Sequence, residues 1–540
     1  MRCLAENYEL ENNTVNLLDR FQQQAARTPD RPALITAKAQ SSFSELERRS
    51  AQAAQMLSAK GLRAGDVALV FQPMSVCLYE VLLALFRLGM VALFVDPQAG
   101  RDTIVHAVAR CRPKALIACH KAQWLRLLSP AVAAIPHKLA TAAWFPGATS
   151  WQRLAAYAPA PEVTDVDDDH PALITFTSGA TGRPKAALRT HGFLCRQHRV
   201  LEKHLDLRPG QLDLTTLPVF VLANLGSGVT SLIPDANLLR PGHIRPARVL
   251  RQIRQYRPQR SAGSPAFYLR LAQAVAVTGE TLPQFETIYT GGAPVYPRTL
   301  DALRKMAPRA RLVAVYGSTE AEPIAHLDDS QIDTSAIERM HTGHGLLAGT
   351  PVDDIELKII RMQWGQAIAT LTAAEFHALQ LPAGQTGEIV VSGAHVLPGY
   401  LDGIGDQETK FAVEGRRWHR TGDAGYLDHR HRLWLMGRCS ARLQDTDGEL
   451  YPFAVEAAAL QQHAVRHAAL IQDGGRRLLV IECHKGRVVD HDRLLQTLRW
   501  AKIDRIREVR KIPMDKRHNA KVDYPALYRQ LRCRDTPGRP

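Results

Sequence analysis

Short apolar runs recur along this chain, and amphipathic helical stretches separate them. VALVF (67–71), KALIA (114–118) and ALITF (172–176) are bounded by Gly, Pro or Asp, as buried strands are. RLVAVYG (311–317) and GEIVVSG (387–393) continue the pattern. Strands joined through helices pair in parallel, because the helix returns the chain to the starting edge of the sheet. The alternation therefore predicts an α/β fold with layers of helices around parallel strands.

Residues 43–57 predict one of these helices. Ser44 is the expected N-cap, and Glu47 follows three residues later, as in a capping box. The most apolar stretch, residues 76–95, contains Glu80 and Arg87. Because charges near the middle of a bilayer are costly, this stretch predicts a buried helix followed by the strand VALFV, not a transmembrane segment.

The length of 540 residues exceeds what one ordinary core can hold, so at least two domains are expected. A composition change near Gly437 and Arg438 suggests the boundary, with residues 1–437 in a large N-terminal domain and 438–540 in a small α+β domain. The polar run after it predicts a linker with a turn at Asp447 and Gly448. Residues 468–471, LLVIEC and a helix at 491–503 would build the small domain.

The net charge of +15 is compatible with an anionic substrate, an acidic partner or a membrane surface. Its densest stretch, residues 502–521, mixes acids with the bases, which favours a solvated face over a nucleic-acid site. No nucleic-acid partner is expected, whereas peripheral membrane contact stays open. Eight cysteines lie without paired spacings, and the amino terminus has no apolar signal segment. A reduced, cytoplasmic setting is therefore predicted.

The strongest local motif is ITFTSGATGRPKAALRTH, residues 174–191, in which an apolar strand runs into a loop rich in Thr, Ser and Gly. Backbone N–H groups of such a loop can surround phosphate oxygens, and hydroxyls and a lysine add donors. Its spacing differs from the Walker A loop, so a P-loop NTPase is disfavoured. Taken alone, the motif fits a surface turn equally well.

This loop resembles the phosphate-binding signature of the adenylate-forming superfamily, which includes acyl-CoA synthetases, adenylation domains and luciferases. The resemblance assigns phosphate contacts to the loop residues Thr177, Ser178, Gly179, Thr181, Gly182 and Lys185. It also assigns an adenine-lining stretch to Gly291, Gly292, Ala293 and Pro294. In the block Tyr316, Gly317, Ser318, Thr319 and Glu320, the resemblance implies that the ring stacks on adenine, Thr319 reaches the α-phosphate and Glu320 holds magnesium.

Further blocks follow in the order of that superfamily. By resemblance, Asp423 takes both ribose hydroxyls, Arg438 contacts the ribose, Ser440 is the hinge and Lys521 reaches the carboxylate and the α-phosphate. Each block alone also fits a turn or a surface charge. Together, in this order, they favour an adenylate-forming enzyme. The resemblance implies a mobile C-terminal domain that carries the catalytic lysine.

The chemistry explains these residue types. A carboxylate and a triphosphate repel each other, and attack at the α-phosphorus gathers negative charge. Mg²⁺ on Glu320 and the ammonium of Lys521 would stabilise that charge. ATP and Mg²⁺ are thus the expected cofactors, with Glu320, Thr319 and Lys521 as catalytic residues.

The second step is less clearly marked. Where the superfamily often has a histidine or aromatic residue, this chain has Val221, which leaves CoA handling in doubt. LFVDP, GVTSLIPD, GSPA and RHNAK resemble the olefin-biosynthesis branch, the β-lactone synthetases related to fatty acid CoA ligases. By resemblance an acyl pocket is expected along Val219, Phe220, Val221, Gly263 and Ser264. A core segment is the equally weighted alternative for 219–227.

Three classes of function remain at this point. The first is activation of a hydrophobic carboxylic acid, such as a fatty or β-hydroxy fatty acid, to an acyl-adenylate. Transfer to CoA or another thiol, including an acyl carrier, would follow, and β-lactone closure is the alternative second step. The others are a non-catalytic adenylate-binding protein and a basic protein of nucleic acid or membranes. Glu320, Asp423 and Lys521 together argue against the second class.

Overall fold

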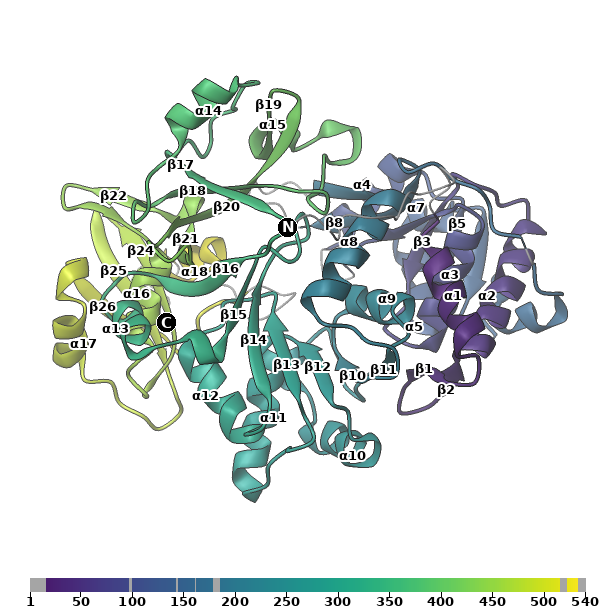
Figure 1. Ribbon diagram of the computed structural model, residues 1–540, viewed down its shortest axis with the longest axis horizontal. Coiled ribbons are helices and arrows are strands. Elements are labelled where there is room, and N and C mark those ends of the chain that lie inside the picture. The colour runs from purple at the N-terminus through teal and green to yellow at the C-terminus, as the bar shows by residue number, and fades with distance from the viewer. Residues whose placement is uncertain are drawn as a thin grey trace, which may run out of the picture. The chain divides into compact units, whose positions relative to one another are not determined.

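The computed structural model describes residues 16–96, 100–141, 144–160, 162–177, 185–514 and 522–532. The chain forms two compact units. The first comprises Met1–Gln211 and Pro218–Ile233, and the second comprises Leu212–Leu217 and Pro234–Pro540. In Figure 1 the elements of the first unit are purple to blue-green, and those of the second run from teal to yellow.

A seven-stranded sheet forms the centre of the first unit. Its strand order is β7 (Thr149–Ser150), β6 (His137–Ala140), β5 (Ala115–Ala118), β3 (Val67–Phe71), β4 (Val91–Phe94), β8 (Pro171–Thr177) and β9 (Lys185–Thr190). All neighbours are parallel except β8 and β9, which form an antiparallel pair. The parallel pairing expected for the apolar runs of this unit is confirmed.

Helices and a small second group of strands complete the first unit. The helices are α1 (Leu18–Arg27), α2 (Phe43–Ser58), α3 (Val76–Arg87), α4 (Arg101–Cys111), α5 (His120–Gln123), α6 (Leu125–Leu128), α7 (Pro130–Ala133), α8 (His191–His204) and α9 (Pro218–Gly226). Strand β1 (Pro32–Ile35) pairs in parallel with β11 (Thr230–Leu232) and antiparallel with β2 (Gln40–Ser42).

The start of α2 differs from the predicted one. Ser42 is its N-cap, with extended backbone, and its hydroxyl accepts a hydrogen bond from the N–H of Glu45 at 3.1 Å. Ser44 already lies inside the helix, so the predicted capping box of Ser44 and Glu47 is wrong. The carboxylate of Glu47 pairs instead with the buried guanidinium of Arg87 in α3. A buried charge needs such a partner, because an unpaired one would be costly.

The apolar stretch at residues 76–95 folds as predicted, into the buried helix α3 and the strand β4. Its Glu80 pairs with Arg49 and accepts a hydrogen bond from the indole of Trp151 at 3.0 Å. Searched over the described residues, no helix is long and apolar enough to cross a membrane. The charges that made a membrane span unfavourable are thus paired inside the protein.

The second unit is built on strands that change from parallel to antiparallel. Parallel neighbours are β10 (Leu212–Thr215), β12 (Arg260–Gly263), β13 (Thr287–Gly291) and β14 (Arg311–Tyr316). Antiparallel strands follow in the order β15 (Ala325–Asp328), β16 (Leu346–Pro351), β21 (Leu433–Arg438), β20 (Arg416–Leu427), β18 (Gly387–Ser392) and β17 (Glu356–Ile360), with β19 (Lys410–Val413) on β20. GEIVVSG forms β18, so parallel pairing is wrong for that run.

Helices α10 (Pro246–Tyr256), α11 (Pro265–Thr278) and α12 (Pro297–Met306) connect the parallel strands of the second unit, as Figure 1 shows. Helices α13 (Thr334–His341), α14 (Ala373–Leu379) and α15 (Asp406–Thr409) belong to its antiparallel part. The carboxyl ends of β13 and β14 therefore lie side by side, as ligand-binding loops of α/β proteins do.

The C-terminal part of the second unit has its own sheet, of β24 (Val465–Asp473), β25 (Arg476–Cys483) and β26 (Arg505–Glu508). Helices α16 (Pro452–Ala459), α17 (His491–Thr497) and α18 (Tyr524–Arg532) cover it with two apolar clusters. The polar run before it is not an open linker, because β22 (Leu443–Asp445) and β23 (Gly448–Leu450) form a hairpin around the predicted turn.

This C-terminal module is attached to α12 through the backbone. The guanidinium of Arg298 donates to the carbonyls of Val465 at 3.0 Å and Arg466 at 2.7 Å. Tyr296, which precedes α12, packs against the apolar cluster around Leu470. The domain boundary between 437 and 438 stays a prediction, since both sides of it belong to the second compact unit.

Candidate nucleotide-binding site

The end of β13 provides a surface with few side chains. A Cβ on Gly291 would lie 2.6 Å from the carbonyl oxygen of Val315, so only glycine allows β13 and β14 to approach this closely. Gly292 adopts a φ of +77°, a conformation that favours glycine, and Ala293 and Pro294 follow. The buried hydroxyl of Thr290 has no partner among the described residues. A flat ring could lie against such a surface.

Tyr316, Asp423 and Arg438 form one connected cluster at the end of β14. The hydroxyl of Tyr316 donates to Oδ2 of Asp423 at 2.8 Å, and Nε of Arg438 lies 3.2 Å from Oδ1. Asp423 and Arg438 face each other as Cα partners of β20 and β21. The structure thus brings together three of the residues that the sequence assigned to adenosine.

The electrostatics of this cluster suit a ribose. The negative charge of Asp423 raises the pKa of Arg438. The pKa of Tyr316 is also raised, mainly by burial and to a lesser extent by Asp423. Arg438 therefore stays charged and Tyr316 stays a hydrogen-bond donor. A carboxylate offers about four lone-pair positions, so two neighbouring hydroxyls can still bind Asp423 beside its present partners.

Glu320 lies in a tight turn after β14. Ser318 donates its N–H to the carbonyl of Ala321 at 2.7 Å, and its hydroxyl accepts the N–H of Glu320 at 3.2 Å. Gly317 is crowded by the Ala321 carbonyl, at 3.1 Å from a built Cβ. Thr319 is partly buried in the same turn. The turn fixes the direction of the Glu320 carboxylate, whose Oε1 accepts the hydroxyl of Tyr400 at 2.7 Å.

The surroundings keep Glu320 ionised. Burial raises its pKa, but His419, the Tyr400 hydrogen bond and Lys410 together lower it below the ordinary value. His419 hydrogen-bonds the carbonyl of Thr409 at 3.2 Å, and Lys410 donates to the carbonyl of Leu397. Sequence reasoning missed Tyr400, Lys410 and His419, which come from β19, β20 and the segment before them.

Glu320 fits the magnesium role that the sequence assigned to it. It offers an anionic oxygen donor, the kind that Mg²⁺ prefers. Within the described ranges, no group of three or more His, Cys, Asp or Glu side chains could hold a metal ion by itself.

The predicted phosphate loop is framed by two paired strands. Thr177 ends β8 and Lys185 begins β9, and their Cα atoms are partners in the antiparallel pair. Lys185 is buried. Ser178, Gly179, Thr181 and Gly182 lie outside the described residues, so their phosphate contacts stay a prediction.

Lys521 also lies outside the described residues. Met514 and Val522, which precede and follow its segment, form an antiparallel bridge. Ser440, the predicted hinge, is exposed in the short helix Cys439–Ala441 directly after β21. The roles of Lys521 and Ser440 stay predictions.

The predicted acyl-pocket residues belong to two units. In the first unit, Phe220 and Val221 are buried in α9 and Val219 is partly buried. In the second unit, Gly263 ends β12, where a Cβ would meet the Thr216 hydroxyl at 3.0 Å, and Ser264 caps α11. Whether both groups line one pocket stays a prediction.

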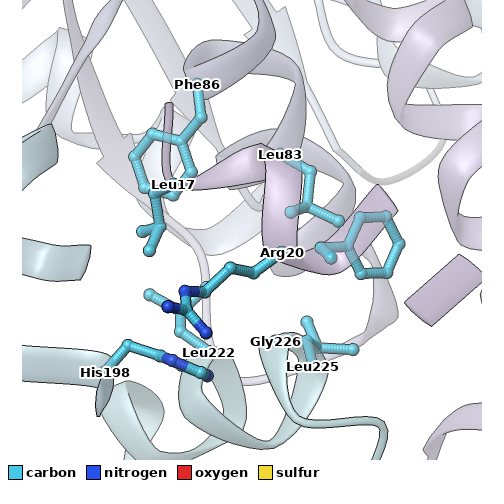
Figure 2. A pocket seen from close by; sticks show the side chains of 9 residues that line it. Leu17, Arg20, Leu83, Phe86, His198, Leu222, Leu225 and Gly226 are labelled. Carbon is cyan, nitrogen blue, oxygen red and sulfur yellow. The ribbon is translucent and has the colours of Figure 1, made fainter. Parts of the chain in front are cut away.

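A small cavity within the first unit lies on another face of α9 (Figure 2). Apolar side chains of α1, α3 and α9 line it with Arg20 and His198, and Gly226 makes room for the His198 ring, which would lie 2.6 Å from a Cβ. The hydroxyl of Ser227 links His198 at 3.1 Å to Glu202 at 2.8 Å. This cavity does not involve Val219, Phe220 or Val221, and among the described residues Nδ1 of His198 has no hydrogen-bond partner.

Comparison with known protein families identifies the family of this chain. The family model described as AMP-binding enzyme matches residues 21–401. The chain belongs to the AMP-binding enzyme family. It is accordingly an adenylate-forming ligase, which uses ATP to activate a small carboxylic acid.

Individual AMP-binding relatives agree with this assignment. An olefin beta-lactone synthetase of Xanthomonas campestris pv. campestris is 30% identical over 509 residues, which covers 89% of each chain. A feruloyl-CoA synthase of an Amycolatopsis species is 27% identical, over 85% of this chain and 86% of its own.

A solved AMP-binding structure confirms the predicted fold class. The anthranilate CoA ligase AuaEII in complex with anthranoyl-AMP superposes with a TM-score of 0.80 at 16% identity, over 97% of this chain and 98% of its own. At this identity the likeness concerns the fold alone. The resemblance read from the sequence motifs is confirmed by the family match.

Proposed function

We propose that this AMP-binding enzyme joins a hydrophobic carboxylic acid to the α-phosphate of ATP and releases pyrophosphate. The connected cluster of Tyr316, Asp423 and Arg438, with the ionised Glu320 in the turn after the same strand, carries the proposal. Asp423 would hold the ribose and Tyr316 would lie against the adenine. Thr319 and the loop from Thr177 to Lys185 would contact the phosphates.

The same residues supply the charge that the reaction needs. Negative charge grows at the α-phosphate when the carboxylate attacks, and no protein nucleophile is required. Glu320 would hold a magnesium ion, whose charge would neutralise phosphate oxygens, and Lys521 would contribute a positive charge beside the reacting groups. Loss of one such preorganised group typically costs ~3 kcal/mol, about a hundredfold in rate.

The composition of α9 supports a hydrophobic substrate. Residues 218–226, PVFVLANLG, contain no acid and no base that could bind a charged side chain. Asn224, the polar exception, donates to the hydroxyl of Ser231 at 3.0 Å within the first unit. An acid with a fatty or aromatic tail fits such a wall better than an amino acid does.

Acid-dependent exchange of labelled pyrophosphate into ATP tests the first step. Lys521→Ala should reduce the exchange about a hundredfold. Lys511→Ala, an exposed lysine before the same segment, is the matched control and should leave it unchanged. A Lys521→Ala protein with full exchange activity would contradict the assigned role.

For the second step we favour closure of a β-lactone by the substrate's own β-hydroxyl. Similarity to olefin beta-lactone synthetases extends over nine-tenths of both chains, and intramolecular attack has a large proximity advantage. Transfer to CoA or an acyl carrier is the second candidate, since feruloyl-CoA synthases match over most of their length.

Mass spectrometry separates the two second steps. A β-hydroxy fatty acid with ATP and Mg²⁺ should give AMP and a product that has lost one water, with or without CoA. A thioester formed only with CoA would overturn lactone closure for that acid. Fatty and aromatic acids without the hydroxyl serve as controls, because they cannot close the ring.

We also propose that residues 438–540 form a mobile domain that pivots at Ser440 between the two steps. The exposed position of Ser440 directly after β21 supports this. Ser440→Pro would stiffen the pivot and should slow product formation more than pyrophosphate exchange. Equal loss of both rates would contradict the pivot. Ser330→Pro, in the exposed 3-10 helix Asp329–Gln331, removes the hydrogen bond from the Ser330 N–H to Asp328 and is the control for general damage.

A further inference from the structure

Large apolar side chains gather at the surface of the first unit. Among the described residues, eight such side chains are mostly exposed, and four of them lie within residues 124–144. These four are Trp124, Leu127, Leu128 and Trp144, with exposed fractions of 51%, 74%, 64% and 76%. Single exposed apolar residues are common on protein surfaces, whereas a group of neighbouring exposed apolar residues is typical of an interaction site.

The four residues, here called the Trp124 patch, belong to one local structure. The ring of Trp124 packs edge-on against Phe145 with 5.4 Å between centroids, and Phe145 follows Trp144 in the chain. Arg126 lies over the same Phe145 ring at 5.6 Å and donates to the carbonyl of Pro146 at 3.1 Å. The turn from α5 to α6 and the segment after residue 143 are thus held together, with apolar groups outward.

The chain around the patch carries positive charge only. Residues 103–161 contain no Asp and no Glu. They contain seven lysines and arginines, namely Arg110, Arg112, Lys114, Lys121, Arg126, Lys138 and Arg153. Lys114 is paired with Asp66, whereas Arg126 lies within the patch and Lys121 is exposed one turn before Trp124.

We propose that the Trp124 patch docks the enzyme onto an anionic lipid surface. Tryptophan and leucine side chains enter the boundary between headgroups and acyl chains, and neighbouring lysines and arginines bind the negative surface. A second copy of the chain fits less well, because a two-fold contact sets a patch against itself and brings like charges together. This inference does not depend on the second reaction step or on the acid that is activated.

Vesicle flotation with the full-length protein tests the proposal. Wild-type protein should float with vesicles of phosphatidylcholine and phosphatidylglycerol at low salt. It should bind pure phosphatidylcholine about tenfold more weakly and lose part of its binding at high salt. No flotation with anionic vesicles, or equal binding to both compositions, would overturn the proposal.

Two triple variants locate the surface. L127S/L128S/W144S should bind anionic vesicles at least about tenfold more weakly. The matched control L239S/V277S/V488S removes three exposed apolar side chains from elsewhere and should bind like wild type. Both should keep pyrophosphate exchange without vesicles, which shows that they are folded. Equal vesicle binding by the two variants would overturn the location.

The charge contribution has its own variant. Lys121→Gln should weaken binding to anionic vesicles about fivefold and leave binding to neutral vesicles unchanged. Analytical ultracentrifugation tests the alternative that a second copy of the chain binds the Trp124 patch. A dimer that becomes monomeric in L127S/L128S/W144S, together with absent vesicle binding, would assign the patch to a second copy and overturn lipid docking.

Discussion

Glu320 in the candidate site and Glu456 in the C-terminal module each have a tyrosine as hydrogen-bond partner, but their pKa values shift in opposite directions. Each carboxylate accepts a tyrosine hydroxyl at 2.7 Å, from Tyr400 and Tyr524. Burial raises both pKa values. At Glu320, His419, the Tyr400 bond and Lys410 outweigh burial and the pKa falls, whereas at Glu456 burial wins and the pKa rises to about 7.

The difference teaches that a hydroxyl donor alone does not keep a buried carboxylate ionised. Neighbouring cations do, because they stabilise the charged form in a region of low dielectric constant. Asp423 is likewise in contact with a tyrosine hydroxyl, from Tyr316, and with a cation, Arg438. Carboxylates of the site are thus provided with cations, and the carboxylate of the module core is not.

Removal of the Glu320 charge would test the comparison most severely. Glu320→Gln keeps the size and the bond to Tyr400 but loses the anionic metal donor, so pyrophosphate exchange should fall about a hundredfold. Titration with Mg²⁺ at fixed ATP measures it, and the magnesium requirement should shift upward. Glu338→Gln, on the exposed side of α13, is the control and should change little. Full activity of Glu320→Gln would break the assignment.

The matching change in the module should act on stability. The folded pKa of Glu456 is about 7 and lies above its ordinary 4.5, so the folded state binds more protons between these values. Its stability therefore falls as pH rises through that window and stays lower above it. Glu456→Gln removes this loss and should stabilise the protein by about 2–3 kcal/mol at pH ~8.

Urea unfolding at both ends of the window checks this prediction. Near pH ~5 the wild-type carboxyl is already protonated, so Glu456→Gln should have almost no effect there. The low-pH measurement is the internal control for packing changes. A variant that is equally destabilised at both pH values would show that Glu456 is ionised in the folded protein.

Asp423→Asn removes the carboxylate that Arg438 and Tyr316 share. One charge-assisted interaction with a bound ribose is lost, worth about 2 kcal/mol, and the KM for ATP should rise roughly thirtyfold with a smaller change in kcat. Steady-state exchange rates at varied ATP measure the split. Asp447→Asn in the exposed turn is the control. A fall in kcat at unchanged KM would contradict the ribose role.

The two tyrosines should give the smallest effects and the sharpest contrast. Tyr400→Phe should slow exchange about tenfold, since one hydrogen bond to a charged group is worth about 1.5 kcal/mol. Tyr524→Phe should leave exchange unchanged but destabilise the protein above neutral pH, because it raises the pKa of Glu456 further. Pyrophosphate exchange and urea unfolding should be measured for both variants. If Tyr400→Phe and Tyr524→Phe changed exchange and stability alike, the contrast between the site and the C-terminal module would be wrong.

The sequence predicted those parts of the site that lie in continuous blocks. Tyr316 ends β14 and Glu320 lies in the turn after it, while Asp423 lies within β20 and Arg438 ends β21, so local patterns located them. Tyr400, Lys410 and His419 were missed because they reach Glu320 from 80 to 99 residues away in the sequence and none belongs to a motif of fixed spacing. Their positions depend on how β19 and β20 pair.

The fold shows the same limit. Apolar runs identified β3, β5 and β8 and their parallel pairing, because helices separate these strands in the chain. The run that forms β18 looks alike but pairs antiparallel, since short loops join its neighbours. Serine spacing placed the N-cap of α2 two residues late, because Ser42 and Ser44 carry the same side chain and only the backbone conformation distinguishes them.

Arg298 holds the C-terminal module by main-chain carbonyls of Val465 and Arg466. Every amino acid provides such carbonyls, so this attachment does not read the side chains that it touches. The Arg298 contacts would therefore be kept with the C-terminal module of a related enzyme, whereas the packing of Tyr296 depends on the apolar side chains of that module. A chimera joined after Arg438 would exchange the module while Tyr316, Asp423 and Arg438 all stay in the recipient chain.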